Sequence, residues 1–231
     1  MHLARRPSSD LVVRTLAVSI VTLAAVACGS DDTVAPLTPA VIARVSADSQ
    51  STPAGVAMAQ PLVVLVTGGN GAPLASTPVA WTIESGGGSL SDTTATTDAE
   101  GHASTVYTPG TASGTARVTA QAGSLTGVVF TLTLTAGAPA AVQKFGFSSP
   151  AVVKGSTLTL SVKVVDQFGN GIPGATVAWT TSGGTTSAAT STTDSGGVAA
   201  TNYTIGDSPG TYALTATVTG LSPVTFSITG V

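Results

Sequence analysis

The residues of this chain that could do covalent chemistry are serines set between aspartate and glycine. Residues 206–210 read Gly-Asp-Ser-Pro-Gly and place Ser208 in the pattern of a nucleophile elbow, and residues 194–197 read Asp-Ser-Gly-Gly around Ser195. A serine nucleophile needs a histidine base within reach, and an elbow needs a helix after the serine. His102 is the only histidine beyond the second residue, so any catalytic triad would have to recruit it.

Each serine motif matches a stretch about 100 residues earlier in which alanine replaces the serine. Ala112 stands opposite Ser208, and Ala99 stands opposite Ser195. Aspartate followed by glycine is typical of a turn between strands. We therefore interpret both motifs as turns and predict no catalytic residue.

A glycine-rich stretch at residues 169–174, Gly-Asn-Gly-Ile-Pro-Gly, fits a dinucleotide-binding pattern by its letters. That pattern binds a pyrophosphate only where a strand turns into a helix. Here a proline and the strand-like residues 176–179 follow. The stretch predicts a β-turn, with Asn170 and Gly171 supplying residues that tolerate positive φ.

Calcium is the one metal that the carboxylates could hold. Asp98 with Glu100 could supply oxygen ligands at one end of a domain, and Asp166 could do so with Asp194. Aspartate more commonly closes turns, and one histidine cannot build a histidine-rich site. We predict no bound metal and no cofactor.

Cys28 is the only cysteine, so the chain cannot form an intramolecular disulfide. It follows a basic start, an apolar run at residues 15–24 and the small residues 25–27, Ala-Val-Ala, which together predict a secretory signal peptide over residues 1–27. The apolar run is too short to span a membrane. The arginine pair at residues 5–6 precedes Pro-Ser-Ser, which disfavours twin-arginine export.

Residues 25–28 resemble a bacterial lipobox, although Ala25 stands where leucine is usual. The resemblance implies a diacylglyceryl thioether on Cys28, cleavage before it and acylation of the new amino terminus, which together anchor a protein to a membrane. Cleavage after Ala27 without lipidation is the alternative. We expect an exported protein, lipid-anchored to the bacterial cell envelope at the outer membrane or cell surface, with residues 28–37 as a lipidated tether.

The remainder of the chain repeats itself with a period close to 100 residues. Residues 79–82, Val-Ala-Trp-Thr, recur at 177–180, and ordered matches continue to the end of both repeats. Upstream, residues 69–73, Gly-Asn-Gly-Ala-Pro, match 169–173, Gly-Asn-Gly-Ile-Pro. These matches indicate two domains of one kind.

Within each repeat, apolar residues alternate with polar ones, as at residues 128–134 and 224–228, which predicts half-buried strands. Turn residues fall about every ten positions, and no stretch after the leader has helical periodicity. We therefore predict an all-β protein, with two tandem immunoglobulin-like antiparallel β-sandwiches after the signal peptide. The first is expected at residues 38–137 and the second at 138–231.

Aromatic residues recur at matching places in the two repeats and predict the cores. A large indole on a central strand would fill the space between two sheets without the disulfide of immunoglobulins. The predicted core residues are Trp81, Trp179, Phe130, Phe226, Tyr107 and Tyr203.

Three motifs of the second repeat, at residues 164–177, 193–199 and 210–212, carry a family resemblance. They are similar to the bacterial immunoglobulin-like group 1 family, the repeats of invasin- and intimin-type surface proteins. The first repeat keeps most of these positions but has no obvious counterpart of Asp166. The turn residues singled out in the two repeats are Asn70, Pro73, Asp98, Gly101, Asp166, Asn170, Pro173, Asp194 and Gly197.

The resemblance implies rigid stalks that hold an adhesive tip away from the cell. Without the leader the chain has five basic and ten acidic residues, which disfavours nucleic acid as a partner. The expected partners are a membrane, through the lipid on Cys28, and an unidentified surface protein or polysaccharide. We predict a non-catalytic cell-surface lipoprotein that acts as a spacer or adhesion module. The alternative is a carbohydrate-binding or hydrolase-associated exported protein, although only 10 aromatics are available for sugar stacking.

Overall fold

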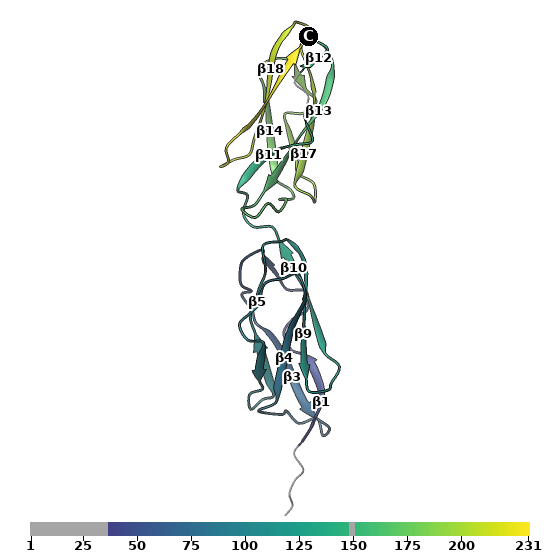
Figure 1. The fold of residues 1–231 in the computed structure, drawn as a ribbon, viewed down its shortest axis with the longest axis vertical. Coiled ribbons are helices and arrows are strands. Elements are labelled where there is room, and N and C mark those ends of the chain that lie inside the picture. The colour runs from purple at the N-terminus through teal and green to yellow at the C-terminus, as the bar shows by residue number, and fades with distance from the viewer. Residues whose placement is uncertain (1–36, 148–150) are drawn as a thin grey trace, which may run out of the picture. The chain divides into compact units, whose positions relative to one another are not determined.

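The computed structural model describes residues 37–147 and 151–231, in which every regular element is a β-strand (Figure 1). The all-β prediction is confirmed. The predicted signal peptide, Cys28 and most of the predicted tether lie outside the described residues. Among the described residues, no helix has the length and apolar character that a membrane crossing requires.

The first group of strands forms two facing sheets and a short ribbon. The strands are β1 (Pro39–Arg44), β2 (Ser51–Pro53), β3 (Leu62–Gly68), β4 (Pro78–Ser85), β5 (Ser89–Leu90), β6 (Thr94–Thr96), β7 (His102–Thr105), β8 (Tyr107–Thr108), β9 (Gly114–Ala122) and β10 (Val128–Thr135). One sheet has the order β1-β3-β7 and the other β2-β10-β9-β4-β6, while β5 pairs with β8. Only β2 and β10 run parallel, and every other pair in this sandwich is antiparallel.

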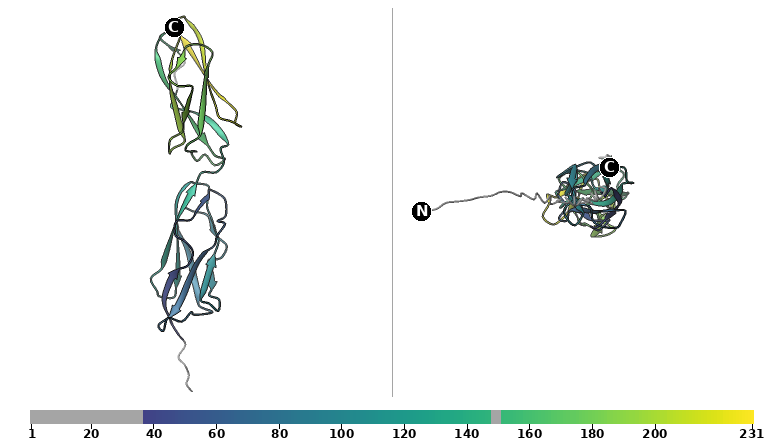
Figure 2. Two further views of the ribbon diagram at one scale, coloured as in Figure 1. Left: turned by 180° about the vertical axis from the view of Figure 1, so that it is seen from behind. Right: turned by 90° about the horizontal axis from the view of Figure 1, so that it is seen from below.

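The second group repeats this plan, and its two layers of strands are visible from both sides (Figure 1, Figure 2). The strands are β11 (Ala141–Phe145), β12 (Ala151–Val152), β13 (Thr157–Val165), β14 (Thr176–Thr181), β15 (Thr185–Thr186), β16 (Thr190–Thr192), β17 (Val198–Thr204), β18 (Gly210–Thr217) and β19 (Val224–Gly230). The sheets have the orders β11-β13-β17-β15 and β12-β19-β18-β14-β16. The β12–β19 pair is again the parallel one. All described residues belong to one compact unit.

The alternating sequence places one side of each strand in a core. Along β3, Leu62, Val64 and Val66 are fully buried, and the residues between them are only partly so. Strand β9 contributes mainly alanines to the same core, which leaves room for larger side chains. Trp81 on β4 and Phe130 on β10 flank β9 in the same sheet and fill that room, with ring centroids 6.0 Å apart.

The second core is built in the same way from Trp179, Tyr203 and Phe226, all of which are buried. Phe147 packs edge-on against Phe226 at 5.7 Å between ring centroids, and the Lys144 ammonium lies 5.4 Å from the Phe226 ring centre.

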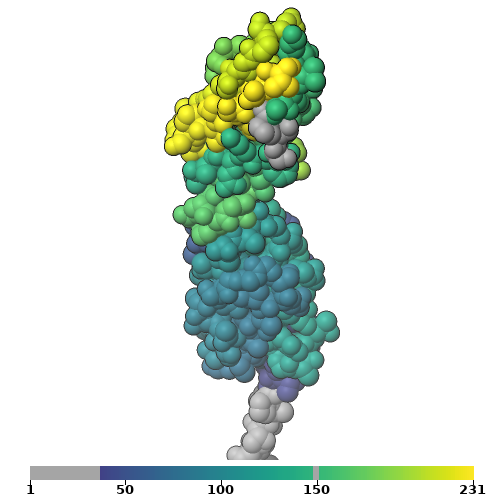
Figure 3. All heavy atoms as spheres, turned by 45° about the horizontal axis from the view of Figure 1, so that its top comes forward, coloured from purple at the N-terminus to yellow at the C-terminus, as the bar shows by residue number. Residues whose placement is uncertain are grey.

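The face drawn in Figure 3 shows closely packed atoms over the first sandwich, with no opening into its core.

The two sandwiches have equivalent strands, but the residues of one loop pair up differently from the sequence match between residues 69–73 and 169–173. The Gly68 N–H donates to the Ala72 carbonyl at 2.9 Å, and the Asp166 N–H donates to the Asn170 carbonyl at the same distance. Gly68 is therefore the counterpart of Asp166, and Ala72 is the counterpart of Asn170. The predicted match of Asn70 with Asn170 is wrong by two residues.

The backbone conformation of the glycine-rich stretch also differs from the expectation. Positive φ occurs at Gly169, at +87°, and at Gly174, at +73°, but not at Asn170 or Gly171. Gly171 is required for another reason, because a Cβ there would lie 2.1 Å from the Gly196 carbonyl oxygen. This glycine permits a close approach between two loops.

Candidate functional site

The turn that begins at Asp98 is held by its own carboxylate. Asp98 Oδ1 accepts hydrogen bonds from the Glu100 N–H at 3.1 Å and the His102 N–H at 2.7 Å. Gly101 takes φ of +78°, which allows the chain to turn back into β7. The His102 ring lies at the exposed start of that strand, with Nδ1 3.8 Å from Asp98 Oδ1.

The turn that contains Ser195 has the same construction. Asp194 Oδ1 accepts from the N–H groups of Gly196 and Val198, each at 2.9 Å, and Gly197 takes φ of +79°. Ser195 is exposed at the tip, where the first repeat has alanine. Its Asp-Ser-Gly-Gly letters therefore describe a turn closed by aspartate.

Ser208 is exposed in a bend that leads directly into strand β18, whereas a nucleophile elbow leads into a helix. Its carbonyl accepts a hydrogen bond from the Tyr212 hydroxyl at 2.5 Å. Among the described residues, no hydrogen bond joins the His102 ring to either candidate serine. The hydrogen bonds that a catalytic triad would need are therefore not found among these residues.

Asp166 is the most unusual charged group among the described residues, because its side chain is buried, with 3% of the residue exposed. Oδ1 accepts from the N–H groups of Phe168 and Asn170, each at 2.9 Å. Oδ2 accepts from the Gly137 N–H at 2.9 Å and from Asn170 Nδ2 at 2.8 Å. In the described part of the chain, no cationic side chain forms an ion pair with it.

Two opposing effects act on the pKa of Asp166. Burial raises it, but the hydrogen bonds from the Asn170 side chain, the Gly137 N–H and the loop N–H groups together outweigh burial and lower the pKa to about 2. The carboxylate is thus ionised at neutral pH and stabilised by backbone and amide donors. Its role in the described structure is to shape a loop.

The same hydrogen bonds bear on the calcium hypothesis. Each oxygen of Asp166 already accepts two hydrogen bonds, which occupy the positions that a cation would need. Asp194 uses its Oδ1 for its own turn. Over residues 37–147 and 151–231, no three acidic, histidine or cysteine side chains cluster in a way that could hold a metal ion.

Two carboxylates of the first sandwich are exposed and bind neighbouring strands. The Thr131 N–H donates to Asp48 at 2.8 Å and is the main cause of the lowered pKa of that carboxyl, aided by Arg44. The Thr119 hydroxyl donates to Glu84 and lowers its pKa in the same way. The exposed ion pairs that these carboxylates form, Asp48 with Arg44 and Glu84 with Arg117, contribute little to stability.

The two core tyrosines anchor glycine-rich loops through their hydroxyl groups. Tyr107 donates to the Gly87 carbonyl at 2.7 Å, and Tyr203 donates to the Gly183 carbonyl. Burial raises the pKa of Tyr107 above its ordinary value. Both hydroxyls thereby satisfy buried polar groups.

The remaining predicted turn residues lie in two loops. Asn70 Oδ1 accepts the Ala72 N–H at 3.0 Å, in a local turn of the first sandwich. Pro73 bridges to Thr67 beside that turn. Pro173 is exposed and lines a shallow cleft.

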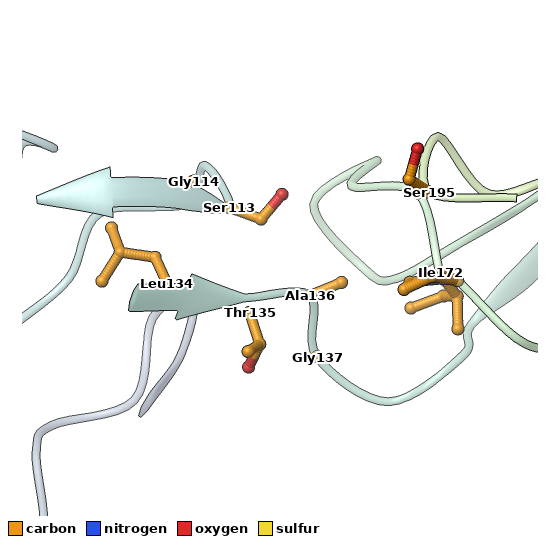
Figure 4. A pocket seen from close by; sticks show the side chains of 10 residues that line it. Ser113, Gly114, Leu134, Thr135, Ala136, Gly137, Ile172 and Ser195 are labelled. Atoms are coloured by element: carbon orange, nitrogen blue, oxygen red, sulfur yellow. The ribbon is translucent and has the colours of Figure 1, made fainter. Parts of the chain in front are cut away.

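This cleft of about 370 Å³ lies where the last strand of the first sandwich runs into the second (Figure 4). Leu134 and Thr135 line it from β10, and Ile172 and Ser195 line it from loops of the second sandwich. Ala136 lies between them. None of the lining residues carries a charge, so the cleft offers no acid or base.

Sequence reasoning missed Phe168 and Gly55. Phe168 is 41% exposed, and an ideal Cβ on Gly55 would lie 2.9 Å from its ring. The available signal was a large apolar residue in a turn, between Gln167 and Gly169.

The comparisons with known proteins agree with this architecture. The profile of the bacterial Ig-like domain (group 1) matches residues 42–135 and 153–231, one stretch in each sandwich. A search among curated proteins finds no match to this sequence.

Several solved structures resemble the chain. FdeC, an adhesin of Escherichia coli, has 19% identity and a TM-score of 0.50, with 82% of this chain and 64% of that chain covered. Invasin, a bacterial integrin-binding protein, has 21% identity and a TM-score of 0.40, covering 83% and 40%. The D0-D1 domain of intimin has 20% identity and a TM-score of 0.35, covering 83% and 98%. The likeness at these identities concerns the fold alone.

Proposed function

This chain belongs to the bacterial Ig-like domain (group 1) family, and on that premise we propose that it is a non-catalytic, exported surface protein whose sandwiches act as a spacer or adhesion module. The observation that carries the proposal is that the family profile matches both sandwiches and so accounts for nearly all of the described chain. The serine and aspartate motifs supply turns, as their hydrogen bonds indicate.

The attachment we propose is a lipid on Cys28. This part of the proposal rests on the sequence, in which Cys28 follows a short apolar run and three small residues. The first strand begins at Pro39, so the ten residues 28–37 would act as the tether between the membrane and the first sandwich. An extended tether of that length reaches at most about 35 Å.

The outward faces of the sheets support contact with a neutral partner. Thr180 pairs with Thr215 across β14 and β18, and Thr215 pairs with Thr225 across β18 and β19. The hydroxyls of Thr215 and Thr225 are 3.0 Å apart. A hydroxyl-rich face with few charges would bind through hydrogen bonds, so we propose a surface protein or polysaccharide as the partner.

Surface labelling of intact cells tests this function. An epitope placed after Val231 should be accessible to antibody on intact cells of the bacterium that makes the protein, and the Cys28→Ser variant should lose that cell-bound signal. Detection only after the cells are permeabilised would contradict display at the surface. An epitope on a cytoplasmic protein of the same cells is the control.

A further inference from the structure

The loop at residues 166–170 of the second sandwich makes polar contacts with the first sandwich. Asn170 Nδ2 donates to the Thr111 carbonyl at 2.8 Å, and Asn170 Oδ1 accepts from the Ser113 N–H at 2.9 Å. One amide side chain thus satisfies a backbone acceptor and a backbone donor on the neighbouring domain. Two such bonds fix the direction of the side chain as well as its distance.

A second contact of the same loop is apolar. An ideal Cβ on Gly55 would lie 2.9 Å from Phe168 Cζ, so the ring rests against the backbone of Gly55. Gly55 is itself held, because its N–H donates to the Gly110 carbonyl at 2.9 Å. Glycine suits this position for two reasons: its φ is +75°, and the Phe168 ring leaves no room for a Cβ.

Asp166 holds the two contacting residues in place. Its buried carboxylate accepts the N–H groups of Phe168 and Asn170 and also the Asn170 side-chain amide. The same carboxylate accepts the Gly137 N–H from the segment that joins the sandwiches. The Asp166 carboxylate therefore holds both the loop and the segment that connects the sandwiches.

The loop's contacting groups are absent from its copy in the first sandwich. There, Gly68 replaces Asp166 and Ala72 replaces Asn170, so neither the carboxylate nor the amide is present. The same turn nevertheless forms.

The receiving edge has a copy in the second sandwich. The Gly55 N–H bonds the Gly110 carbonyl, and the Gly155 N–H bonds the Gly206 carbonyl, so the two edges match. In the copy, Pro209 stands where Ser113 stands, and proline has no N–H to donate. The edge of the first sandwich therefore offers a backbone donor that its copy in the second sandwich lacks.

We propose that Asp166, Phe168 and Asn170 form an interdomain latch, which binds the edge at residues 111–113 and holds the two sandwiches in one fixed relation. The latch is independent of the proposed surface function, since it concerns only the coupling of two folded domains. It would let the pair act as one rigid spacer.

Residual dipolar couplings of residues 29–231 test the latch, because these residues include both complete cores. A latched pair aligns as one body, and both sandwiches then fit one alignment tensor. Asn170→Ala removes the amide, and the copy of this turn tolerates alanine at Ala72. Ser113→Pro removes the donor from the other domain, and the copy of this edge tolerates proline at Pro209.

We expect each variant to give two separate tensors while the chemical shifts of both cores stay unchanged. Asn70→Ala, in the corresponding loop of the first sandwich, is the control and should keep the single tensor. The double variant should add nothing to either single change, since both remove the same interaction. Two tensors in the unmodified protein, or one tensor in both variants, would overturn the latch.

Discussion

At the scale of single residues, the main finding is a buried carboxylate that has no cationic partner among the described residues. A charge removed from water is costly unless hydrogen bonds replace the lost hydration. Asp166 has four such bonds, one of them from Gly137 on the connecting segment. The charge thereby fastens the loop at residues 166–170 to the connecting segment.

Acid should weaken the second sandwich through Asp166. Its pKa is about 2 when folded and near the ordinary value of 3.8 when unfolded, so its contribution to stability is complete above about pH 4 and is lost as pH falls through 2. Urea unfolding from pH 5 to pH 2, followed by the Trp179 indole NMR signal, measures this loss. Asp166→Asn should be less stable at pH 5 and should show a smaller loss on acidification. An acid response identical to that of the unmodified protein would exclude Asp166 as its source.

The two core tryptophans differ in one hydrogen bond. Trp179 Nε1 donates to Ser191 Oγ at 2.8 Å, whereas Trp81 Nε1 is buried without a partner among the described residues. Strand pairing explains the difference, because Ser191 lies opposite Val177 and Ala95 lies opposite Val79 in the first sandwich. The first domain therefore has an unsatisfied donor in its core.

Exchanging these residues between the sandwiches should shift stability in opposite directions. Ala95→Ser supplies an acceptor for Trp81 and should stabilise the first sandwich by about 1 kcal/mol, and Ser191→Ala should destabilise the second by about 1–3 kcal/mol. Thermal unfolding of each variant, resolved by the two indole signals, measures both changes. Equal effects of Ser191→Ala on both sandwiches would contradict the assignment.

At the scale of elements, strand positions follow from the sequence and loop alignments do not. The alternation at residues 128–134 matches β10, because each second side chain enters the core. The letters Gly-Asn-Gly-x-Pro suggested a match that backbone hydrogen bonds place two residues away. Turn-forming residues can serve at several positions of a loop, so their letters fix the presence of a turn better than its alignment.

Two glycines of one loop separate the two reasons for which glycine is needed. Gly169 has φ of +87° and no atom within 4 Å of an ideal Cβ, so Gly169→Ala should cost about 1–2 kcal/mol through backbone strain. Gly171 would place a Cβ 2.1 Å from the Gly196 carbonyl oxygen. Gly171→Ala should therefore cost about 3 kcal/mol or more, since backbone must move. Urea midpoints of the two variants, compared with the parent, check this order, and a larger effect at Gly169 would contradict it.

At the scale of the whole molecule, the repeat and the family could be predicted from sequence, since matched residues recur over nearly the full length after the leader. The contacts of Phe168 and Asn170 with the first sandwich could not be predicted, because they join residues more than 50 positions apart, as in the bond from Asn170 to Thr111. The nature of the anchor depends on Cys28, outside the described residues.

The mass of the mature protein, extracted from the membrane fraction, tests the central claim most directly. The account predicts a chain that begins at Cys28 and carries a lipid-sized increment, together with loss of both the increment and membrane retention in Cys28→Ser. A protein in the soluble fraction that begins at Cys28 or Gly29 without added mass would contradict the lipid anchor and indicate a freely exported pair of Ig-like domains.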